Sequence, residues 1–282
     1  AAVRGRGGAV TGAPVVILPR GTLGRRIGRR ARDWVPAAAV LVLGIVAWEG
    51  LVRGLDIQRF LLPAPSAILD TLLERRSELW NAGLYTFSEA FGGFVIGCTL
   101  AVLAAIVLAR FRGLGRALMP FAIAANAVPI IAFAPITNQW FGPLNKTSKM
   151  AIAAILVFFP VMVNTLRGLT SVRPSSIELM RSYASGELEI FRRVRLPNSL
   201  PYLFSALKVA TVLAMIGAIV GEYFLSSQEA LGFQIRNSAA LFQFELAWAA
   251  IVVASVLGIA FYASVALLER LTMGWHPSAR GE

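Results

Sequence analysis

The stretch 246-LAWAAIVVASVLGIAFYASVALL-268 contains 23 residues and no charged side chain. An α-helix rises about 1.5 Å per residue, so about 20 consecutive apolar residues cross the roughly 30 Å hydrocarbon layer of a bilayer. The aliphatic and aromatic composition is therefore typical of a helix that crosses a membrane, and the rest of the chain can be compared with it.

Five further runs have a similar length and apolar character. Three contain no charge, and two contain a single charge each, Glu49 or Lys208. The runs without charge are 91–109, 117–145 and 150–166, and the other two are 34–52 and 196–221. The run 117–145 holds four prolines, and since neighbouring helices can satisfy the carbonyls that proline frees, it is predicted as one kinked helix. The sequence thus predicts an all-α polytopic membrane protein with six transmembrane helices.

The bulk composition agrees with this class. Of the 282 residues, 57% are hydrophobic and only 15% are charged, and the mean hydropathy is +0.68. Soluble domains average about 45–50% apolar and about 25% charged residues. The chain has one cysteine, Cys98, and one histidine, His276, which exclude a disulfide framework and a tetrahedral metal site made by this chain alone. Cys98 is predicted to be a small buried apolar residue.

The net charge of +12 follows the predicted topology. With the N-terminus on the inside, the inner segments hold 19 Lys and Arg residues and the outer segments hold 7. This is the positive-inside pattern, and it predicts that both termini are cytoplasmic. The basic residues sit at helix ends rather than on one face interleaved with aromatics, so no nucleic-acid partner is expected.

The two ends of the chain are predicted to be tails. Residues 1–33 are rich in arginine, and a twin-arginine export signal is the alternative interpretation, but no small-residue cleavage site follows the first apolar run. We expect a disordered cytoplasmic tail that touches anionic membrane lipid. Residues 273–282 are expected to form a second cytoplasmic tail.

The inner segment between the fourth and fifth runs is much longer than a turn. Ser175 and Glu178 have the spacing of a capping box, which predicts a helix start. Ser185 and Gly186 should end this helix, and Pro197 should mark the far boundary of a second one that starts near Glu187. Two short helices at an angle are predicted.

Both short helices carry apolar residues at a spacing of three. These are Ile177, Met180 and Tyr183 on the first helix, and Leu188, Phe191 and Val194 on the second. Such stripes need a cover, which can be a partner protein, the membrane surface or the inner end of the bundle. The spacing alone leaves these alternatives open.

This segment resembles the signature loop of binding-protein-dependent ABC importer permeases. In that loop, a Glu and two small or apolar residues are followed by a glycine, and an aliphatic, any residue, Leu and Pro come later. The matching residues here are Glu178, Leu179, Met180, Ala184, Val194, Leu196 and Pro197. Ala184 replaces the usual glycine, and Gly186 follows two residues later, which raises the question of where the corner lies.

Other stretches are similar to the nitrate, sulfonate and taurine branch of the same family. They are Leu62–Ile68 with its Leu-Pro-x-Pro-Ser pattern, Pro129, Pro135, Trp140–Gly142, Ala218–Glu222, Leu231–Gly232 and Leu268–Arg270. The resemblance covers residues 34–272. It implies a type I ABC importer permease domain over this range, with a coupling-helix loop at about 174–197, in the bacterial inner membrane.

The resemblance also implies partners and roles. A second permease copy, as in a homodimer, would complete the path, and ABC ATPase subunits and an extracytoplasmic substrate-binding protein would complete the importer. The residues expected at or beside the contact with the ATPase are Glu178, Tyr183, Ala184, Ser185, Gly186, Leu188 and Pro197.

No Gly-Lys-Ser/Thr phosphate-binding motif is present in the sequence, because the three lysines follow Asn145, Ser148 and Leu207. We therefore expect a chain that is not an enzyme and holds no cofactor, with ATP and Mg²⁺ on the partner ATPase.

Polar residues within the runs are candidates for the translocation path, because they are costly in lipid and usually face the bundle interior. The candidates are Glu222, Asn126, Asn138, Glu89 and Asn164. The alternative is that each bonds to a neighbouring helix. Lys208 is predicted to snorkel, and Gly92, Gly93 and Gly97 are spaced to admit a second helix closely.

Two other classes of protein were weighed against this one. In an intramembrane enzyme, serine chemistry would need a Gly-x-Ser-x-Gly motif or a serine with a membrane histidine or lysine, and aspartyl chemistry would need two membrane aspartates. The one histidine is in the C-terminal tail, and Asp33, Asp56 and Asp70 lie at or outside the predicted helix ends, so this class is disfavoured. A secondary transporter would need no ATPase and would leave the long inner loop without a partner. The resemblance leaves the solute open between a nitrate-, sulfonate- or taurine-like anion and a vitamin precursor such as a pyrimidine or riboflavin.

Overall fold

The computed structural model describes residues 23–125, 128–224 and 226–273, and every described element is helical. The chain divides between Leu51 and Val52 into two units, which are described separately. In the first unit, α1 (Leu23–Gly54) begins within the segment that was assigned to the N-terminal tail. Its apolar residues from Val35 onward are largely exposed. The remainder of that predicted tail, residues 1–22, and residues 274–282 lie outside the described residues.

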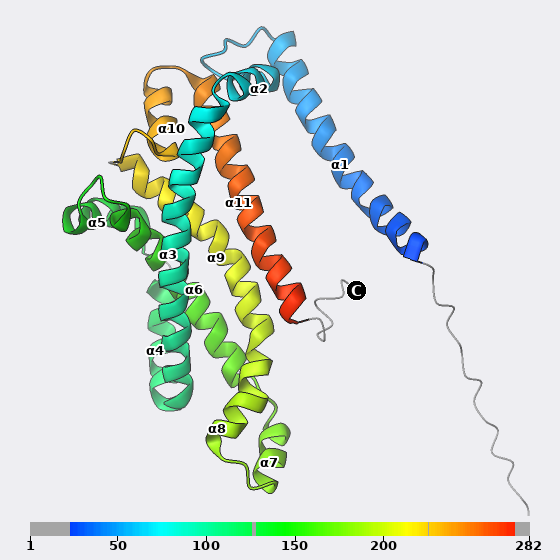
Figure 1. The fold of residues 1–282 in the computed structure, drawn as a ribbon, viewed down its shortest axis with the longest axis vertical. Coiled ribbons are helices and arrows are strands. Elements are labelled where there is room, and N and C mark those ends of the chain that lie inside the picture. The colour runs from blue at the N-terminus through cyan, green and yellow to red at the C-terminus, as the bar shows by residue number, and fades with distance from the viewer. Residues whose placement is uncertain (1–22, 126–127, 225, 274–282) are drawn as a thin grey trace, which may run out of the picture. The chain divides into compact units, whose positions relative to one another are not determined.

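The second unit is a helical bundle (Figure 1). In chain order it contains α2 (Pro65–Glu74), α3 (Arg76–Arg110), α4 (Arg112–Ala125), the 3₁₀ turn η1 (Ile130–Phe133), α5 (Ala134–Phe141), α6 (Lys146–Thr170), α7 (Pro174–Ser182), α8 (Glu187–Ile190), the π-helical turn η2 (Phe191–Arg195), α9 (Leu196–Phe224), α10 (Leu231–Ala240) and α11 (Phe244–Thr272).

Five described helical stretches are long and apolar enough to cross a membrane. They are Val35–Gly54, Arg76–Arg110, Lys146–Thr170, Glu187–Phe224 and Phe244–Thr272, and Gly113–Ala125 is a shorter apolar helix. Five of the six predicted spans are therefore continuous helices. The sixth, residues 117–145, is not.

The prediction of one kinked helix over residues 117–145 was wrong. α4 ends at Ala125, and α5 does not begin until Ala134. Pro129 precedes the turn η1 and Pro135 lies in the first turn of α5, where a missing amide hydrogen costs little. Gly142, with φ of +88°, then ends α5. Pro129 and Pro135 thus separate and start helical segments instead of bending one helix, whereas Pro120 lies inside α4.

The core of the bundle is α6, which packs against α3 on one side and α9 on the other. A β-carbon on Gly97 would lie 2.5 Å from the carbonyl oxygen of Ala154, and one on Gly217 would lie 2.8 Å from Cα of Ala153. Both distances are too short for carbon contacts, which are optimal near 3.5–4.0 Å. The close approach predicted at Gly93 and Gly97 is confirmed, and α9 uses a glycine in the same way on the other face of α6.

Two other predictions about buried residues have clear outcomes. The thiol of Cys98 is free and buried, as expected for a small apolar residue. Lys208 does not snorkel, because its ammonium group donates to Oε2 of Glu269 at 2.7 Å, where α9 meets α11. The lysine side chain is 22% exposed and the glutamate side chain 10%, so this ion pair is largely withdrawn from solvent.

The short helices lie at the two ends of the bundle. α7 and α8 form one end, and α2 and α10 lie toward the opposite end (Figure 1). The long inner segment and the α10 region are therefore separated by the full length of the spanning helices.

Candidate functional site

The segment from α7 to η2 forms an elbow at one end of the bundle. α7 begins at Pro174, whose fixed φ suits the first position of a helix. The predicted capping box is wrong, because the N-cap is Arg173, no side chain caps the helix, and Ser175 lies within its first turn. The proline, and not the serine, accounts for where the helix begins.

The corner of the elbow lies at Ala184. This residue has φ of +55°, a left-handed conformation that costs an L-residue with a β-carbon about 1–2 kcal/mol. The amide of Ser185 donates to the carbonyl of Met180 at 3.1 Å, which closes the turn. Gly186 has φ of −71° and is the N-cap of α8. The corner therefore lies where the resembled family usually has glycine, and Gly186 does not replace it.

The second helix of the elbow does not stop at Pro197. α8 continues through η2 into α9, so that residues 187–224 form one helical stretch. Proline normally clashes with the carbonyl four residues earlier, which for Pro197 is that of Arg193 in the π-helical turn. The wider turn accommodates the ring, so the predicted boundary is wrong. The elbow is thus joined directly to a spanning helix.

The apolar stripes of the elbow are divided between two surroundings. Ile177, Met180, Phe191 and Val194 are half-buried against the protein, and Ile190 is buried. The side chains at the corner are exposed: Tyr183 by 74%, Leu188 by 64% and Leu179 by 56%. Leu179, Tyr183 and Leu188 form an apolar knob that the described part of the chain leaves exposed.

Salt bridges hold the knob in shape. Arg181 on α7 pairs with Glu187 on α8 at 3.2 Å, across the corner, and Arg195 reaches the same carboxylate at 3.8 Å. Glu189 and Arg193 pair at 3.2 Å one turn apart. Exposed pairs of this kind contribute little stability individually, and the Arg181–Glu187 pair is the one of the three that joins the two arms of the elbow. Glu178 is exposed on α7, and Pro197 is half-buried at the start of α9.

A second group of polar residues lies inside the bundle, at the α10 end. Glu222 of α9 is fully buried, and its Oε2 accepts from the amide of Gly232 at 2.8 Å. Oγ1 of Thr86 accepts from the amide of Leu231 at 3.0 Å. Side chains from α9 and α3 therefore cap the first two amides of α10, which tie that helix to the bundle.

Three further residues complete this polar cluster. Glu89 is 1% exposed and lies beside Glu222, and among the described residues Oε2 of Glu89 and Oε1 of Glu222 have no hydrogen-bond partner. The ammonium group of Lys149, also 1% exposed, acts on both carboxyl groups and donates to Oδ1 of Asn138 at 3.3 Å and to the carbonyl of Pro143. The cluster thus connects α3, α5, α6, α9 and α10. Polar groups withdrawn from water in this way require such mutual contacts.

The predicted path residues are thus distributed unevenly. Glu222, Glu89 and Asn138 belong to the buried cluster within one chain. Asn164 is half-buried on α6, and its Nδ2 donates to the carbonyl of Pro160 at 2.8 Å, one turn away. Asn126 lies outside the described residues. Their role in a translocation path stays a prediction.

Sequence reasoning missed two members of the cluster. Lys149 was counted as a residue of the outer loop because it precedes an apolar run, but α6 begins at Lys146 and therefore places Lys149 inside the bundle. Thr86 lies five residues before the second apolar run and gave no signal of its own. The buried glutamates Glu89 and Glu222 were the one available sign, since buried carboxylates imply a partner.

The bundle of spanning helices with an exposed apolar elbow defines a multi-pass membrane protein built to be contacted at one end. Comparison with known proteins identifies the family. Residues 93–273, more than half of the chain, match the model of the binding-protein-dependent transport system inner membrane component, and the chain belongs to this family.

Individual relatives agree. The chain is 32% identical over 84% of its length to the riboflavin transport system permease protein of Chloroflexus aurantiacus, covering 89% of that protein. It is 32% identical over 82% of its length to the formylaminopyrimidine transport permease protein of Halalkalibacterium halodurans, covering 92% of that protein. It is 28% identical over 84% of its length to the putative aliphatic sulfonates transport permease protein of Escherichia coli, covering 91% of it.

A solved structure supports the same fold. The crystal structure of an amino acid ABC transporter with histidines matches with a TM-score of 0.56 and 18% identity, over 71% of this chain and 96% of that chain. The chain is thus a multi-pass permease subunit of an ABC importer for a small solute, with the fold that the sequence predicted.

Proposed function

We propose that the apolar knob at the corner of the elbow is the contact through which a separate ABC ATPase drives this permease. Leu179, Tyr183 and Leu188 are exposed and apolar, and exposed large apolar patches in a folded protein mark interaction sites. Because α8 continues into α9, a push on the knob acts directly on a spanning helix. This continuity is the observation that carries the proposal.

Transport then follows from alternating access. Closure of the ATPase pair moves the two elbows of a permease dimer, and the bundle turns the solute site from the outer to the inner face. The buried cluster around Glu222 keeps α10 attached to α3 and α9 during this movement. ATP and Mg²⁺ are bound by the ATPase, and this chain holds no cofactor.

The remaining partners follow from the family. An extracytoplasmic binding protein delivers the solute at the α10 end, a second copy of this chain completes the path, and membrane lipid surrounds the bundle. The distribution of Lys and Arg supports a topology with cytoplasmic N- and C-termini, and in this topology the elbow is cytoplasmic. The membrane is a bacterial inner membrane.

For the solute, we favour a heterocyclic vitamin or vitamin precursor over a small inorganic or sulfonate anion. The relatives named for riboflavin and formylaminopyrimidine are each 32% identical to this chain, whereas the sulfonate and taurine permeases of Escherichia coli are 28% and 23% identical. Uptake of labelled riboflavin or aminopyrimidine by the assembled importer, and no uptake of labelled taurine or nitrate, is the expected result. The reverse pattern contradicts this choice.

The docking proposal is tested by copurification of the ATPase with variants of the full chain. Leu188→Asp places a charge in the centre of the knob, and loss of a hot-spot contact of about 2 kcal/mol weakens binding about 30-fold. Leu241→Asp is the matched control, because Leu241 is 58% exposed in the turn between α10 and α11, at the opposite end of the bundle. The control should retain the ATPase.

Transport measurements decide between the importer and its rival. In liposomes, the full complex should accumulate solute only with ATP, and the purified permease alone should neither hydrolyse ATP nor accumulate solute. Uptake by the permease alone would instead establish a secondary transporter, and retention of the ATPase by Leu188→Asp would remove the knob from the contact.

A further inference from the structure

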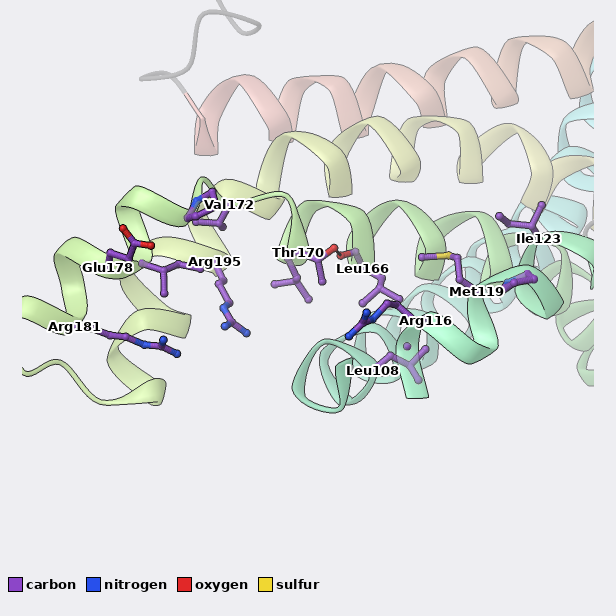
Figure 2. Close-up of a pocket in the computed structure, with 15 residues that line it drawn as sticks. Leu108, Arg116, Met119, Ile123, Leu166, Thr170, Val172, Glu178, Arg181 and Arg195 are labelled. Carbon is purple, nitrogen blue, oxygen red and sulfur yellow. Dashed lines mark hydrogen bonds between the residues drawn. The ribbon is translucent and has the colours of Figure 1, made fainter. Parts of the chain in front are cut away.

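The elbow end of the bundle contains a cavity that is separate from the polar cluster around Glu222. It has a volume of about 880 Å³ and lies between α4, α6 and the elbow. Figure 2 shows α6 running along one side of it, α4 on the second side and the elbow, with Arg181 and Arg195, on the third. The cavity is therefore bounded by α6 with the end of α3, by the short apolar helix α4 and by the elbow.

Most of the cavity wall is apolar. Leu108 from α3, Met119 and Ile123 from α4, and Leu166 and Leu169 from α6 line it. The outward surface of α4 is apolar as well, since Leu118, Phe121 and Ile123 are exposed. The apolar lining thus continues onto a helix surface suited to contact with hydrocarbon.

Arginines approach the cavity from opposite sides. Arg116 extends from α4 toward the space that Arg181 and Arg195 approach from the elbow (Figure 2). Arg181 and Arg195 share one carboxylate, that of Glu187. Arg116 has no ion-pair partner among the residues described. With Glu178 in the wall, three guanidinium groups face two carboxylates, and the cavity keeps one uncompensated positive charge.

The depth of the cavity in the membrane follows from the ends of the spanning helices. Leu108 lies two residues before the end of α3, and Leu169 lies one residue before the end of α6. The uncharged stretches of α3 and α6 end at Arg110 and Arg167 in the last turns of these helices, so the arginines of the cavity lie near the level where the apolar part of the bundle ends, and the apolar wall lies just inside it. In the orientation of the proposed function, on which this step rests, that level is the headgroup layer of the cytoplasmic leaflet.

We propose that this cavity binds an anionic phospholipid of the cytoplasmic leaflet, with its phosphate at Arg116 and Arg195 and its acyl chains along α4 and α6. Guanidinium groups bind phosphate through paired charge-assisted hydrogen bonds, and basic pockets between spanning helices on the cytoplasmic side suit anionic headgroups. The lipid would join α4 to the elbow.

The test measures lipid retained by the full chain, purified from nanodiscs of phosphatidylcholine with or without phosphatidylglycerol. Native mass spectrometry should show phosphatidylglycerol bound in preference to phosphatidylcholine. Arg116→Gln, which removes a guanidinium group on the surface of α4, should weaken retention of phosphatidylglycerol about tenfold. Arg270→Gln, which replaces an exposed arginine in the last turn of α11, is the matched control and should retain it fully.

Three results would overturn the proposal: equal retention of phosphatidylglycerol by Arg116→Gln and the unchanged chain, equal binding of both lipids by the unchanged chain, or occupation of the cavity by the transported solute. A photo-crosslinking residue in place of Met119 distinguishes the last case, since it would capture solute instead of lipid. The readout needs neither ATP nor a docked ATPase, so a failure of elbow docking and a failure of lipid binding are separately visible.

Discussion

The close packing of α3 on α6 gives a quantitative prediction for Gly97→Ala. The new β-carbon would lie 2.4 Å from Cγ2 of Val157, 2.5 Å from the carbonyl oxygen of Ala154 and 2.8 Å from its Cα. Two of these atoms belong to the α6 backbone, which cannot rotate away as a side chain can. The two helices must therefore separate locally.

The size of the effect is a balance of two terms. Overpacking of a tight core costs about 1–3 kcal/mol, and an unyielding backbone places Gly97→Ala at the upper end. Alanine regains about 1 kcal/mol over glycine in a helix interior. The net loss is about 2 kcal/mol in the free energy of unfolding, which corresponds to a fall in Tm of about 4–8 °C for a domain of this size.

The assay is thermal unfolding of the purified chain in detergent, followed by tryptophan fluorescence. Gly258→Ala is the matched control, because a β-carbon there meets only Cγ of Met215, at an ordinary 3.9 Å. The control should keep or raise the Tm. If Gly97→Ala matches the control, the helices do not approach as closely as described, and the account of the core is wrong.

Three further perturbations address the ion pair, the α10 cap and the elbow. Lys208→Met leaves Glu269 unpaired and should lower the free energy of unfolding by about 2 kcal/mol. The double variant with Glu269→Gln should regain most of this loss. If the losses of the two single variants instead add, the two residues do not interact. Thr86→Val leaves the buried amide of Leu231 without an acceptor and should lower the free energy of unfolding by about 1–3 kcal/mol. Amide hydrogen exchange should become faster only at the start of α10, and unchanged exchange there would refute the cap. Ala184→Gly removes about 1–2 kcal/mol of left-handed backbone strain and adds about 0.5–1 kcal/mol of conformational entropy in the unfolded chain, so amide hydrogen exchange at the corner should slow slightly. Gly186→Ala, which has open space around it, should not slow this exchange. Faster exchange in Ala184→Gly would place the corner elsewhere.

The spanning helices and the elbow could be predicted from the sequence because their signals are local. The apolar runs of about 20 residues have one stable solution in lipid, so their helical state was decided by length and composition. Ser185 and Gly186 correctly marked the break in the elbow. The spacing of Gly93 and Gly97 predicted a close helix contact, but it did not predict that the second helix is α6.

The errors arose where the outcome depends on neighbours that the sequence does not place. A proline in an apolar run can bend one helix or separate two helices, and at Pro129 and Pro135 the structure shows separate helical segments. Lys208 forms an ion pair with Glu269, 61 residues away in the sequence, so its ammonium group does not extend to the membrane surface. Lys149 is stable inside the bundle only because α3, α5 and α9 bring acceptors to it.

The elbow carries the central claim, and accessibility of its corner tests that claim most directly. In a chain with Cys98→Ala and Leu188→Cys, a membrane-impermeant maleimide should label Cys only from the cytoplasmic side, and assembly with the ATPase should protect it. Labelling from the outer side would reverse the topology. Labelling that is unaffected by a bound and active ATPase would show that the knob is not the contact through which the permease is driven.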